Sequence, residues 1–490
     1  MNILIASSEV VPFAKTGGLA DVAGALPKEI KKLKHDVVVV MPCYKTIDKN
    51  KFKLELVGNF DVQIAGGIEK ADLYKTKLDK TTVPVYFIAN PKYFDRDHLY
   101  QESGEDYIDN DERFAFFDRA ILEMCKYLDY KPELIHCNDW QTALVPVYLK
   151  TLYLNDPFYT NTATLFTIHN LAYQGLFEPK KALQVTQLPA EVFSYEKLEF
   201  WGKFSFIKGG LIYADLLNTV SDMYSKEIQT EEYGCGLQGL LSTRSADLYG
   251  VINGIDYSVW DPKADPNIKE NYSLQKLEGK EINKKELLKQ YGLKYKENTP
   301  VIGVISRLAD QKGFDLIAEI IDQLMQKNLQ IVILGTGEPK YHQLFASIAE
   351  KYPAKAGIAL KYDAMLAQLI YAGSDMFLMP SRYEPCGLGQ LISLKYGTIP
   401  IVRETGGLAD TIVDYDLVDV FEADKANGFM FLDYNSEKLL EKIERAVEVY
   451  ADEKAWKKLM KNAMKYDFSW KASAIKYMEL YFCALGKKQG

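Results

Sequence analysis

Short apolar runs alternate with helix-like patterns along most of the chain. The runs lie at residues 3–6, 37–41, 85–88, 134–137, 164–168, 301–305, 331–334, 376–379, 399–402 and 429–431. Because apolar and polar positions do not alternate within them, they are typical of parallel strands buried on both faces. Strands that alternate with helices indicate βαβ units in open sheets. The pattern therefore predicts an α/β protein with two such series, one in each half of the chain.

A polar, Lys- and Glu-rich stretch at residues 261–299 separates the two series and shows no strand pattern. The sequences NGID and WDP just before it mark a break in the chain. We therefore expect domains at residues 1–250 and 251–467, followed by a terminal helix at residues 468–490. The apolar residues that share helical spacing in that last segment are Trp470, Ala474, Tyr477, Met478, Tyr481 and Leu485.

The hexapeptide TGGLAD occurs twice, at residues 16–21 and 405–410. Each copy follows an apolar strand and begins a helix pattern, and Pro27 predicts a kink in the first helix. Paired glycines let a ligand approach the backbone, and helix N-termini attract anions. A tight turn is the simpler explanation of a single copy. Two identical copies, one in each half, favour a shared function in ligand binding. Lys15 adds a cation beside the first copy.

Composition narrows the class of protein. A net charge of −8 and a pI near 5.5 argue against a general nucleic-acid binder, which would need a basic face. The 6 cysteines are widely spaced and form no CxxC pair, which argues against structural zinc and against a disulfide framework. The sequence has no signal-peptide pattern and no apolar run of the roughly 18 residues that span a bilayer. We therefore expect a cytoplasmic protein without a membrane partner.

Polar residues follow several of the expected strands. His136 and Asp139 come after one strand in HCNDWQ, His169 follows the next in TIHNLAYQG, and Asn253 lies at the domain boundary. Because ligands of open α/β sheets bind beyond the carboxyl ends of the strands, these positions are candidates for a site.

Arg307 and Lys312 follow the first strand of the second half, in SRLADQKGFD. A planar guanidinium and a mobile ammonium can divide the oxygens of a diphosphate between them. The alternative is that both are ordinary surface cations. Their place in a glycine-containing strand–helix loop favours the phosphate site.

Glu384 lies in the loop PSRYEPCGLGQ, whose glycines suit a close ligand. A common helix-terminal acid is the alternative. Cys386 stands near a helix start, where its thiol pKa could be lowered for redox sensing, although we favour plain packing. The chain has 5 histidines and no HExxH motif, so a metal site is a poor interpretation. A serine hydrolase is also poorly supported, because the sequence lacks a GxSxG motif.

Taken together, the motifs resemble the bacterial glycogen synthases, retaining glucosyltransferases that use ADP-glucose, and their relatives the plant starch synthases. The motifs that carry the resemblance, in order, are KTGGLADVAGALP, HCNDWQ, TIHNLAYQG, LEFWGKFSFIKGGL, VINGIDYSVWDP, SRLADQKGFDL, PSRYEPCGLGQ, RETGGLADT and DFSW. They run from Met1 to about Leu485. The absence of a plant-type N-terminal extension favours a bacterial enzyme.

The resemblance implies the glycosyltransferase-B fold: two facing Rossmann-like domains with a deep interdomain cleft, and a C-terminal helix that crosses back to the N-terminal domain. The N-terminal domain would hold the acceptor and catalytic side, and the C-terminal domain would bind ADP-glucose. The second copy of TGGLAD would shape the donor pocket through its backbone.

The resemblance also implies roles for single residues. Arg307 and Lys312 would bind the ADP diphosphate, and Lys15 would reach the same phosphates from the opposite lobe. Glu384 would contact the donor sugar, and Tyr362 would stack on adenine. Four residues would surround the transferred glucose: Asp21, Asp139, His169 and Asn253. The catalytic group would be Asp139, His169, Glu384, Arg307 and Lys312. The remaining residues expected beside the donor are Gly17, Gly18, Cys386, Gly387, Leu388, Thr405, Gly406 and Gly407.

The reaction implied is transfer of glucose from ADP-glucose to the non-reducing 4-hydroxyl of an α-1,4-glucan such as glycogen, with retention and release of ADP. No cofactor and no metal are expected, because cations and a helix N-terminus would stabilise the departing diphosphate. Many retaining relatives have a second Glu where this chain has Ile392, which favours the glycogen and starch synthase branch. The oligomeric state does not follow from the sequence.

Two rival interpretations stay open. A related transferase could use UDP-glucose or another acceptor, because one sequence does not reveal the shape of the nucleotide pocket. A catalytically silent binding protein would have lost some of the expected catalytic residues, and all of them are present.

Overall fold

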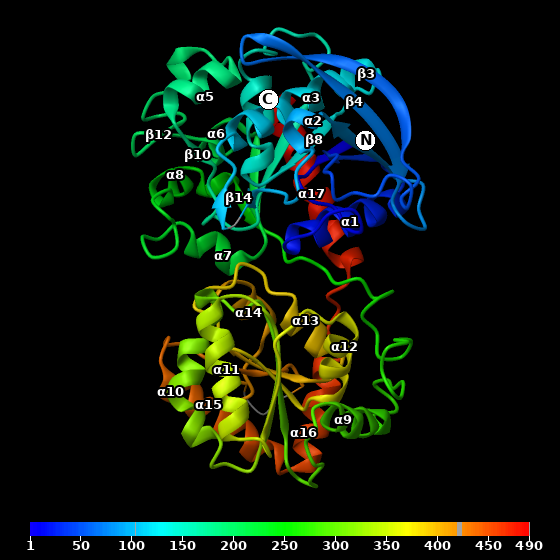
Figure 1. The fold of residues 1–490 in the computed structure, drawn as a ribbon, viewed down its shortest axis with the longest axis vertical. Coiled ribbons are helices and arrows are strands. Elements are labelled where there is room, and N and C mark those ends of the chain that lie inside the picture. The colour runs from blue at the N-terminus through cyan, green and yellow to red at the C-terminus, as the bar shows by residue number, and fades with distance from the viewer. Residues whose placement is uncertain (103, 419–423, 490) are drawn as a thin grey trace. The chain divides into compact units, whose positions relative to one another are not determined.

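The computed structural model describes residues 1–102, 104–418 and 424–489, which form two compact units. One unit comprises Met1–Val220, Ser225–Val251 and Trp470–Gly490, and the other comprises Ser221–Tyr224 and Ile252–Ser469. We call them the N-terminal and C-terminal units (Figure 1). The domain bounds expected from the sequence fall close to these divisions, and the roles that the resemblance implies for the two halves stay predictions.

The N-terminal unit is built on a 9-stranded sheet with the order β14-β13-β9-β8-β1-β2-β5-β4-β3. Its central strands pair in parallel, and β3 and β4 are added antiparallel at one edge. The strands are β1 Asn2–Ala6, β2 Asp36–Pro42, β3 Glu55–Ile64, β4 Gly67–Lys77, β5 Pro84–Ala89, β8 Leu134–Asn138, β9 Ala163–Ile168, β13 Leu216–Thr219 and β14 Leu248–Gly250. Two small sheets add β6 Gln101–Glu102, β7 Glu105–Asp106, β10 Leu176–Phe177, β11 Glu199–Phe200 and β12 Lys203–Ser205.

The helices of this half of the chain include α1, which begins inside the first TGGLAD copy and continues through Pro27 to Lys32. Its apolar stripe is buried at Leu19, Val22 and Ile30, as the spacing predicts. The helices are α1 Gly18–Lys32, α2 Pro91–Phe94, α3 Asn110–Tyr127, α4 Leu144–Leu149, α5 Pro179–Thr186, α6 Phe206–Tyr213, α7 Asp222–Glu227 and α8 Gln238–Thr243.

The terminal helix α17, Trp470–Gln489, belongs to the N-terminal unit, where it packs on α1 and β9 (Figure 1). Its Tyr481 hydroxyl lies 2.9 Å from Nδ1 of His136. His136 was expected beyond its strand, and this was wrong. It lies inside β8, fully buried, and burial lowers its pKa to about 3. His136 therefore joins the terminal helix to the sheet as a neutral, structural side chain.

The C-terminal unit has a 6-stranded parallel sheet with the order β17-β16-β15-β18-β19-β20. Its strands are β15 Val301–Ile305, β16 Gln330–Leu334, β17 Ala356–Ala359, β18 Met376–Met379, β19 Ile399–Arg403 and β20 Phe429–Phe431. Its helices are α9 Glu278–Gln290, α10 Phe314–Leu324, α11 Pro339–Lys351, α12 Ala364–Gly373, α13 Gly389–Lys395, α14 Gly406–Thr411, α15 Ser436–Tyr450 and α16 Glu453–Ala463.

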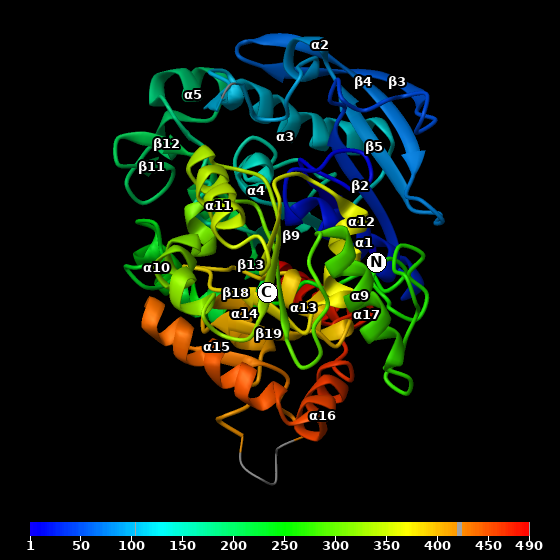
Figure 2. The ribbon, with the colours of Figure 1, turned by 60° about the horizontal axis from the view of Figure 1, so that its bottom comes forward.

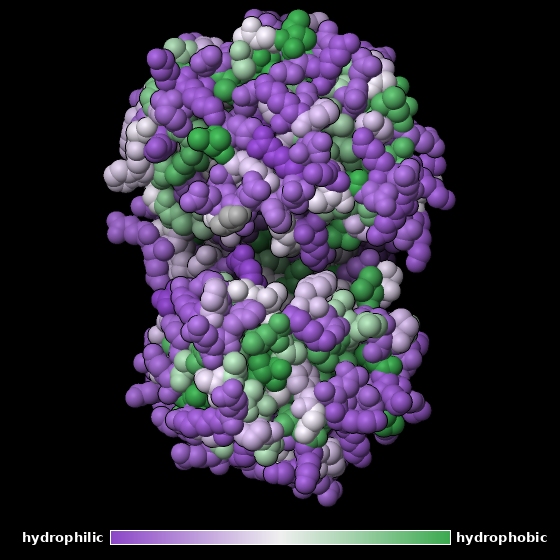
Figure 3. Space-filling model, in the orientation of Figure 1, coloured by the Kyte–Doolittle hydropathy of each residue, from purple (hydrophilic) through white to green (hydrophobic). Residues whose placement is uncertain are grey.

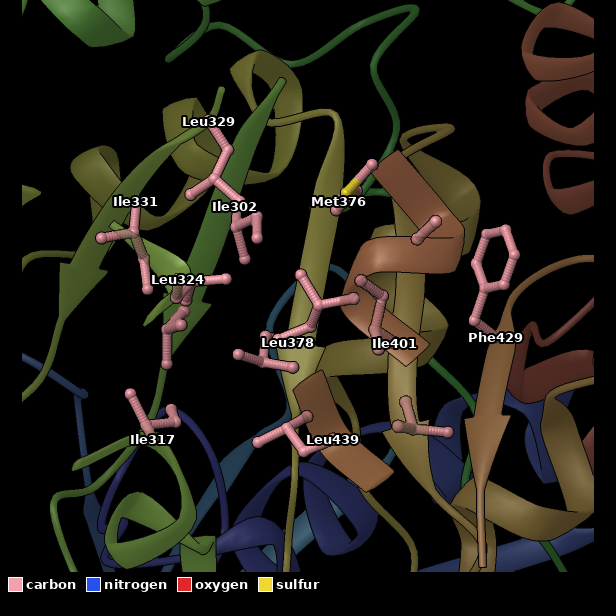
Figure 4. Close-up of a cluster of buried hydrophobic side chains, with 14 of the residues drawn as sticks. Ile302, Ile317, Leu324, Leu329, Ile331, Met376, Leu378, Ile401, Phe429 and Leu439 are labelled. Atoms are coloured by element: carbon pink, nitrogen blue, oxygen red, sulfur yellow. The ribbon is translucent and has the colours of Figure 1, made fainter. Parts of the chain in front are cut away.

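Helices cover both faces of this second sheet. Ile302, Ile331, Leu378 and Ile401 point toward one face, where α10, α11, α15 and α16 bury their apolar stripes (Figure 4). The helices α15 and α16 follow one another along this unit (Figure 2). Residues of neighbouring register point the other way, toward α9, α12 and α13. Burial on both faces explains why these strands read as continuous apolar runs.

Hydrophilic residues dominate the surface drawn in Figure 3, where hydrophobic side chains occur in small groups. Across the described part of the chain, no helix combines the length and the apolar character needed to cross a bilayer.

Candidate active site

In the N-terminal unit, the first TGGLAD copy lies open on the surface. Gly17 and Gly18 are exposed, and a Cβ built on either would meet nothing within 4 Å. Lys15 is exposed as well, and its ammonium lies 2.7 Å from a carboxylate oxygen of Asp21. Burial raises the pKa of Asp21, against the attraction of Lys15. The glycines here leave room for a ligand and are not required for packing.

Glu9 is the residue beside this copy that the sequence did not reveal. Its carboxylate is buried and accepts hydrogen bonds from the backbone N–H groups of Thr16 and Gly17 and from the Tyr100 hydroxyl. It thereby satisfies the first free donors at the N-terminus of α1. The signal was a lone acid three positions after the last residue of β1.

Asp139 and His169 are brought together at the ends of β8 and β9. The backbone N–H of His169 donates to Oδ1 of Asp139 at 2.7 Å. Asp139 has φ +57°, a left-handed conformation that a non-glycine side chain rarely adopts. Such strain is typical of functional positions. Burial raises the pKa of Asp139 to about 7, although hydrogen bonds from the backbone of His169 and Asn170 lower it.

The imidazole of His169 is neutral, because burial lowers its pKa to about 3. Its Nε2 lies 2.8 Å from Oδ1 of Asn138, whose amide nitrogen donates to the carbonyl of Ala6. The amide oxygen therefore faces the ring, and Nε2 carries the proton that His169 donates to it. Asn138 fixes the tautomer, and the sequence pattern did not single it out.

We expect the variant Asp139→Asn to flatten the dependence of stability on pH. The folded state keeps the Asp139 proton up to about pH 7, whereas the unfolded chain releases it near its ordinary pKa of about 4. Stability therefore falls as pH rises between these values, by roughly 2–4 kcal/mol. Thermal unfolding from pH 4 to pH 8 measures the slope. The matched control is Asp129→Asn, an exposed aspartate also at positive φ. An unchanged slope in Asp139→Asn would contradict the assignment.

In the C-terminal unit, Lys312 and Glu384 form an ion pair. Nζ of Lys312 lies 2.6 Å from Oε2 of Glu384, and the Ser381 hydroxyl donates to the same oxygen at 3.0 Å. Glu384 is only 6% exposed, and Lys312 is the cation paired with this buried side chain. The sequence predicted both residues for the site but not their pairing.

The loop that follows Glu384 presents free backbone donors. Among the described residues, none accepts a hydrogen bond from the backbone N–H of Cys386, Gly387 or Leu388. The side chain of Gln390 holds this loop by donating to the carbonyls of Cys386 and Gly387 at 2.9 and 3.0 Å. Successive N–H groups at the start of a helix form a binding place for an anion or for sugar oxygens.

Cys386 does not have the lowered pKa that its position suggested. Burial raises the pKa of its thiol to about 12, and the backbone N–H of Asn253 donates to the sulfur. The thiol is therefore inert, and the redox interpretation is wrong. The side chain of Asn253 is itself 4% exposed, and its Oδ1 has no partner among the described residues. An unpaired buried amide oxygen is available to a ligand hydroxyl.

The second TGGLAD copy is packed against this loop. The backbone N–H of Gly407 donates to the carbonyl of Glu384 at 3.1 Å. A Cβ on Gly406 would stand 2.1 Å from the Glu384 carbonyl oxygen, and one on Gly407 would stand 2.0 Å from that of Cys386. Thr405 is fully buried. The identical hexapeptides therefore lie in different surroundings, and the second one packs against the backbone of the Glu384 loop.

Arg307 and Tyr362 are the two predicted residues that stand apart. Both are exposed, Tyr362 by 86%, in the loops that follow β15 and β17. Within the described ranges, neither side chain has a hydrogen bond or an ion pair. No hydrogen bond or ion pair joins either side chain to Glu384, and the three residues are related by following β15, β17 and β18 of one parallel sheet. Among the described residues, no group of three or more His, Cys, Asp or Glu side chains is arranged to hold a metal ion.

The family comparisons match both halves of the chain. The starch synthase catalytic domain family matches residues 2–243, and the glycosyl transferases group 1 family matches residues 285–465. A glycogen synthase of Syntrophotalea carbinolica is 48% identical over 482 residues, which cover 98% of each chain. A glycogen synthase of Thermosipho melanesiensis is 48% identical over 490 residues and 100% of each chain.

Two solved structures of glycosyltransferases resemble this chain in fold. The catalytic domain of starch synthase IV from Arabidopsis thaliana, bound to ADP and acarbose, superposes with a TM-score of 0.91 at 34% identity over 99% of each chain. The sucrose-phosphate synthase of Thermosynechococcus elongatus, at a TM-score of 0.60 and 16% identity, shares the fold alone. The expected two-domain α/β architecture of the glycosyltransferase-B type is thus confirmed, and the chain belongs to the glycogen synthase and starch synthase family of glycosyltransferases.

Proposed function

We propose that this protein transfers glucose from ADP-glucose to the non-reducing 4-hydroxyl of an α-1,4-glucan, with retention of configuration and release of ADP. The observation that carries the proposal is the loop at Cys386, Gly387 and Leu388, whose free N–H groups lie beside the Lys312–Glu384 pair. The related starch synthase IV, 34% identical, was solved with ADP and acarbose bound, which supports a nucleotide and a glucan as ligands.

Cations of this chain would stabilise the departing diphosphate. Arg307 has no competing anion among the described residues, and Lys312 can exchange Glu384 for a phosphate oxygen. Lys15 is also assigned to the phosphates, in exchange for Asp21. Fixed positive charge lowers the barrier because it acts most strongly on the charge that develops as the diphosphate leaves. We propose that no metal ion takes part, and unchanged activity in excess EDTA tests this.

The transferred sugar would become oxocarbenium-like as the bond to ADP breaks, so it needs nearby oxygen dipoles. We assign this role to the backbone carbonyl of His169, and we assign contacts with the sugar hydroxyls to Asp21, Asp139, Asn253 and Glu384. The neutral imidazole of His169 suits such a place, because it adds no positive charge beside a cationic sugar. The incoming hydroxyl would attack C1 from the face that ADP leaves and pass its proton to the departing phosphate.

A donor panel with product analysis tests the assignment. Initial rates on glycogen with ADP-glucose should exceed those with UDP-glucose by at least tenfold, and digestion of the product should show only new α-1,4 bonds. An equal or reversed donor preference contradicts the nucleotide assignment. Binding of donor and glucan without any transfer would instead support the catalytically silent interpretation.

A further inference from the structure

Two large aromatic side chains of the N-terminal unit stand almost fully in solvent. Trp201 is 83% exposed and Tyr195 is 84% exposed, near the hairpin that joins β11 and β12 (Figure 2). Trp201 and Gly202 form its turn, with φ +51° and +75°. A tryptophan in a left-handed conformation costs free energy, and its exposed ring gains none from burial. Folding alone does not account for this residue.

Hydrogen bonds from buried Lys208 and to Glu199 hold the backbone of the segment that carries these rings. Lys208 is 7% exposed, and its ammonium donates to the backbone carbonyls of Tyr195 and Glu199, at 2.5 and 2.6 Å. The carboxylate of Glu199 accepts from the backbone N–H of Gly202 at 2.7 Å. These hydrogen bonds fix the backbone that carries Tyr195 and Trp201, and a preorganised backbone lowers the cost of binding a ligand there.

Contacts connect Trp201 to the loop that carries His169. A Cβ on Gly236 would stand 3.2 Å from Nε1 of Trp201, so the indole edge lies against this glycine. The neighbouring carbonyl of Cys235 accepts from the side chain of Gln174 at 3.0 Å. Gln174 follows Tyr173, which is 53% exposed and whose N–H donates to the carbonyl of Asn170. The β11–β12 hairpin is therefore linked, through residues 235–236 and Gln174, to the loop that carries His169 and Tyr173.

We propose that Tyr173, Tyr195 and Trp201 form an aromatic ledge that binds an α-glucan chain outside the reacting centre. The inference rests on the proposed function. Aromatic rings combine a flat apolar face with low conformational entropy, and they match the C–H faces of pyranose rings. Continuity with the His169 loop makes the glucan the expected occupant, because a chain whose end reacts at His169 must leave along a neighbouring surface.

Binding in the absence of a donor tests the ledge. In affinity electrophoresis through glycogen-containing gels, Trp201→Ala should weaken retardation at least fivefold, and Trp201→Phe should restore most of it. The matched control is Phe482→Ala, which removes a 57% exposed ring from α17. Equal retardation of the wild type and Trp201→Ala overturns the ledge, even if the wild type transfers glucose. Circular dichroism of each variant shows whether it folds.

Kinetics provide the second readout. Trp201→Ala should raise KM for glycogen at least fivefold and change KM for maltotriose and for ADP-glucose less than twofold, because a short acceptor does not reach the ledge. Equal increases in all three KM values would assign Trp201 a general structural role. If Trp201→Ala only changes a dimer into a monomer in sedimentation, the face is an interface between copies, and the proposal is wrong. A wild type that binds glycogen through Trp201 without transferring glucose would refute the proposed function alone.

Discussion

Replacing Gly407 by alanine is expected to lower the free energy of unfolding by about 3 kcal/mol, whereas Gly18→Ala should change it by less than about 0.5 kcal/mol. Both are the second glycine of TGGLAD. A Cβ on Gly407 would stand 2.0 Å from the carbonyl oxygen of Cys386, and this backbone cannot move cheaply because Gln390 holds it. A Cβ on Gly18 would meet nothing within 4 Å, at a helix start that favours alanine over glycine.

Thermal and urea unfolding of the two variants measure the difference, and hydrogen exchange locates it. Exchange at residues 384–388 should quicken in Gly407→Ala only. The two variants should differ less in activity than in stability, because Gly18 lies in the open surface that we assign to the donor phosphates and its replacement should also lower activity. Equal loss of stability in both variants would show that the two copies do the same structural work, contrary to their surroundings.

The apolar runs identified the parallel strands because burial on both faces leaves no polar positions in them. Every expected run lies inside an observed strand, from β1 to β20. The same reasoning missed β3 and β4, which form an antiparallel edge hairpin with many exposed side chains. It also missed β17, AGIA, whose small residues lack a strand signal. Such strands owe their pairing to neighbours that a local pattern does not contain.

The candidate site was harder to predict than the fold, for reasons that particular residues show. The two TGGLAD copies are identical in sequence, yet Gly18 faces open space and Gly407 faces backbone. Only the tertiary surroundings distinguish them. Glu9, the tautomer of His169 and the high pKa of Cys386 depend likewise on burial and on partners that are distant in sequence. Residue types at strand ends predicted candidates, and the structure supplied their protonation and pairing.

The pairing of Lys312 with Glu384 leads to the prediction with the largest effect on activity. A diphosphate held by Lys312, as we propose, would compete with Glu384, since Nζ of Lys312 lies 2.6 Å from Oε2 of Glu384. We expect Lys312→Ala to lower kcat/KM for ADP-glucose by at least 100-fold and to weaken ADP binding at least tenfold. The variant removes a charge-assisted contact and also leaves Glu384 buried without its counterion.

Glu384→Gln should separate affinity from turnover. The amide keeps the shape of the side chain but no longer attracts Lys312 as strongly, so ADP should bind equally well or up to about fivefold more tightly. Turnover should still fall at least 50-fold, because the carboxylate that we assign to the donor sugar is lost. Calorimetry with ADP and steady-state rates with ADP-glucose measure the two effects. The matched control is Lys351→Ala, which breaks the exposed 2.7 Å pair with Asp322 in the same unit and should change neither. If Glu384→Gln weakens ADP binding as much as Lys312→Ala does, Glu384 orients the lysine for the phosphate and does not compete with it.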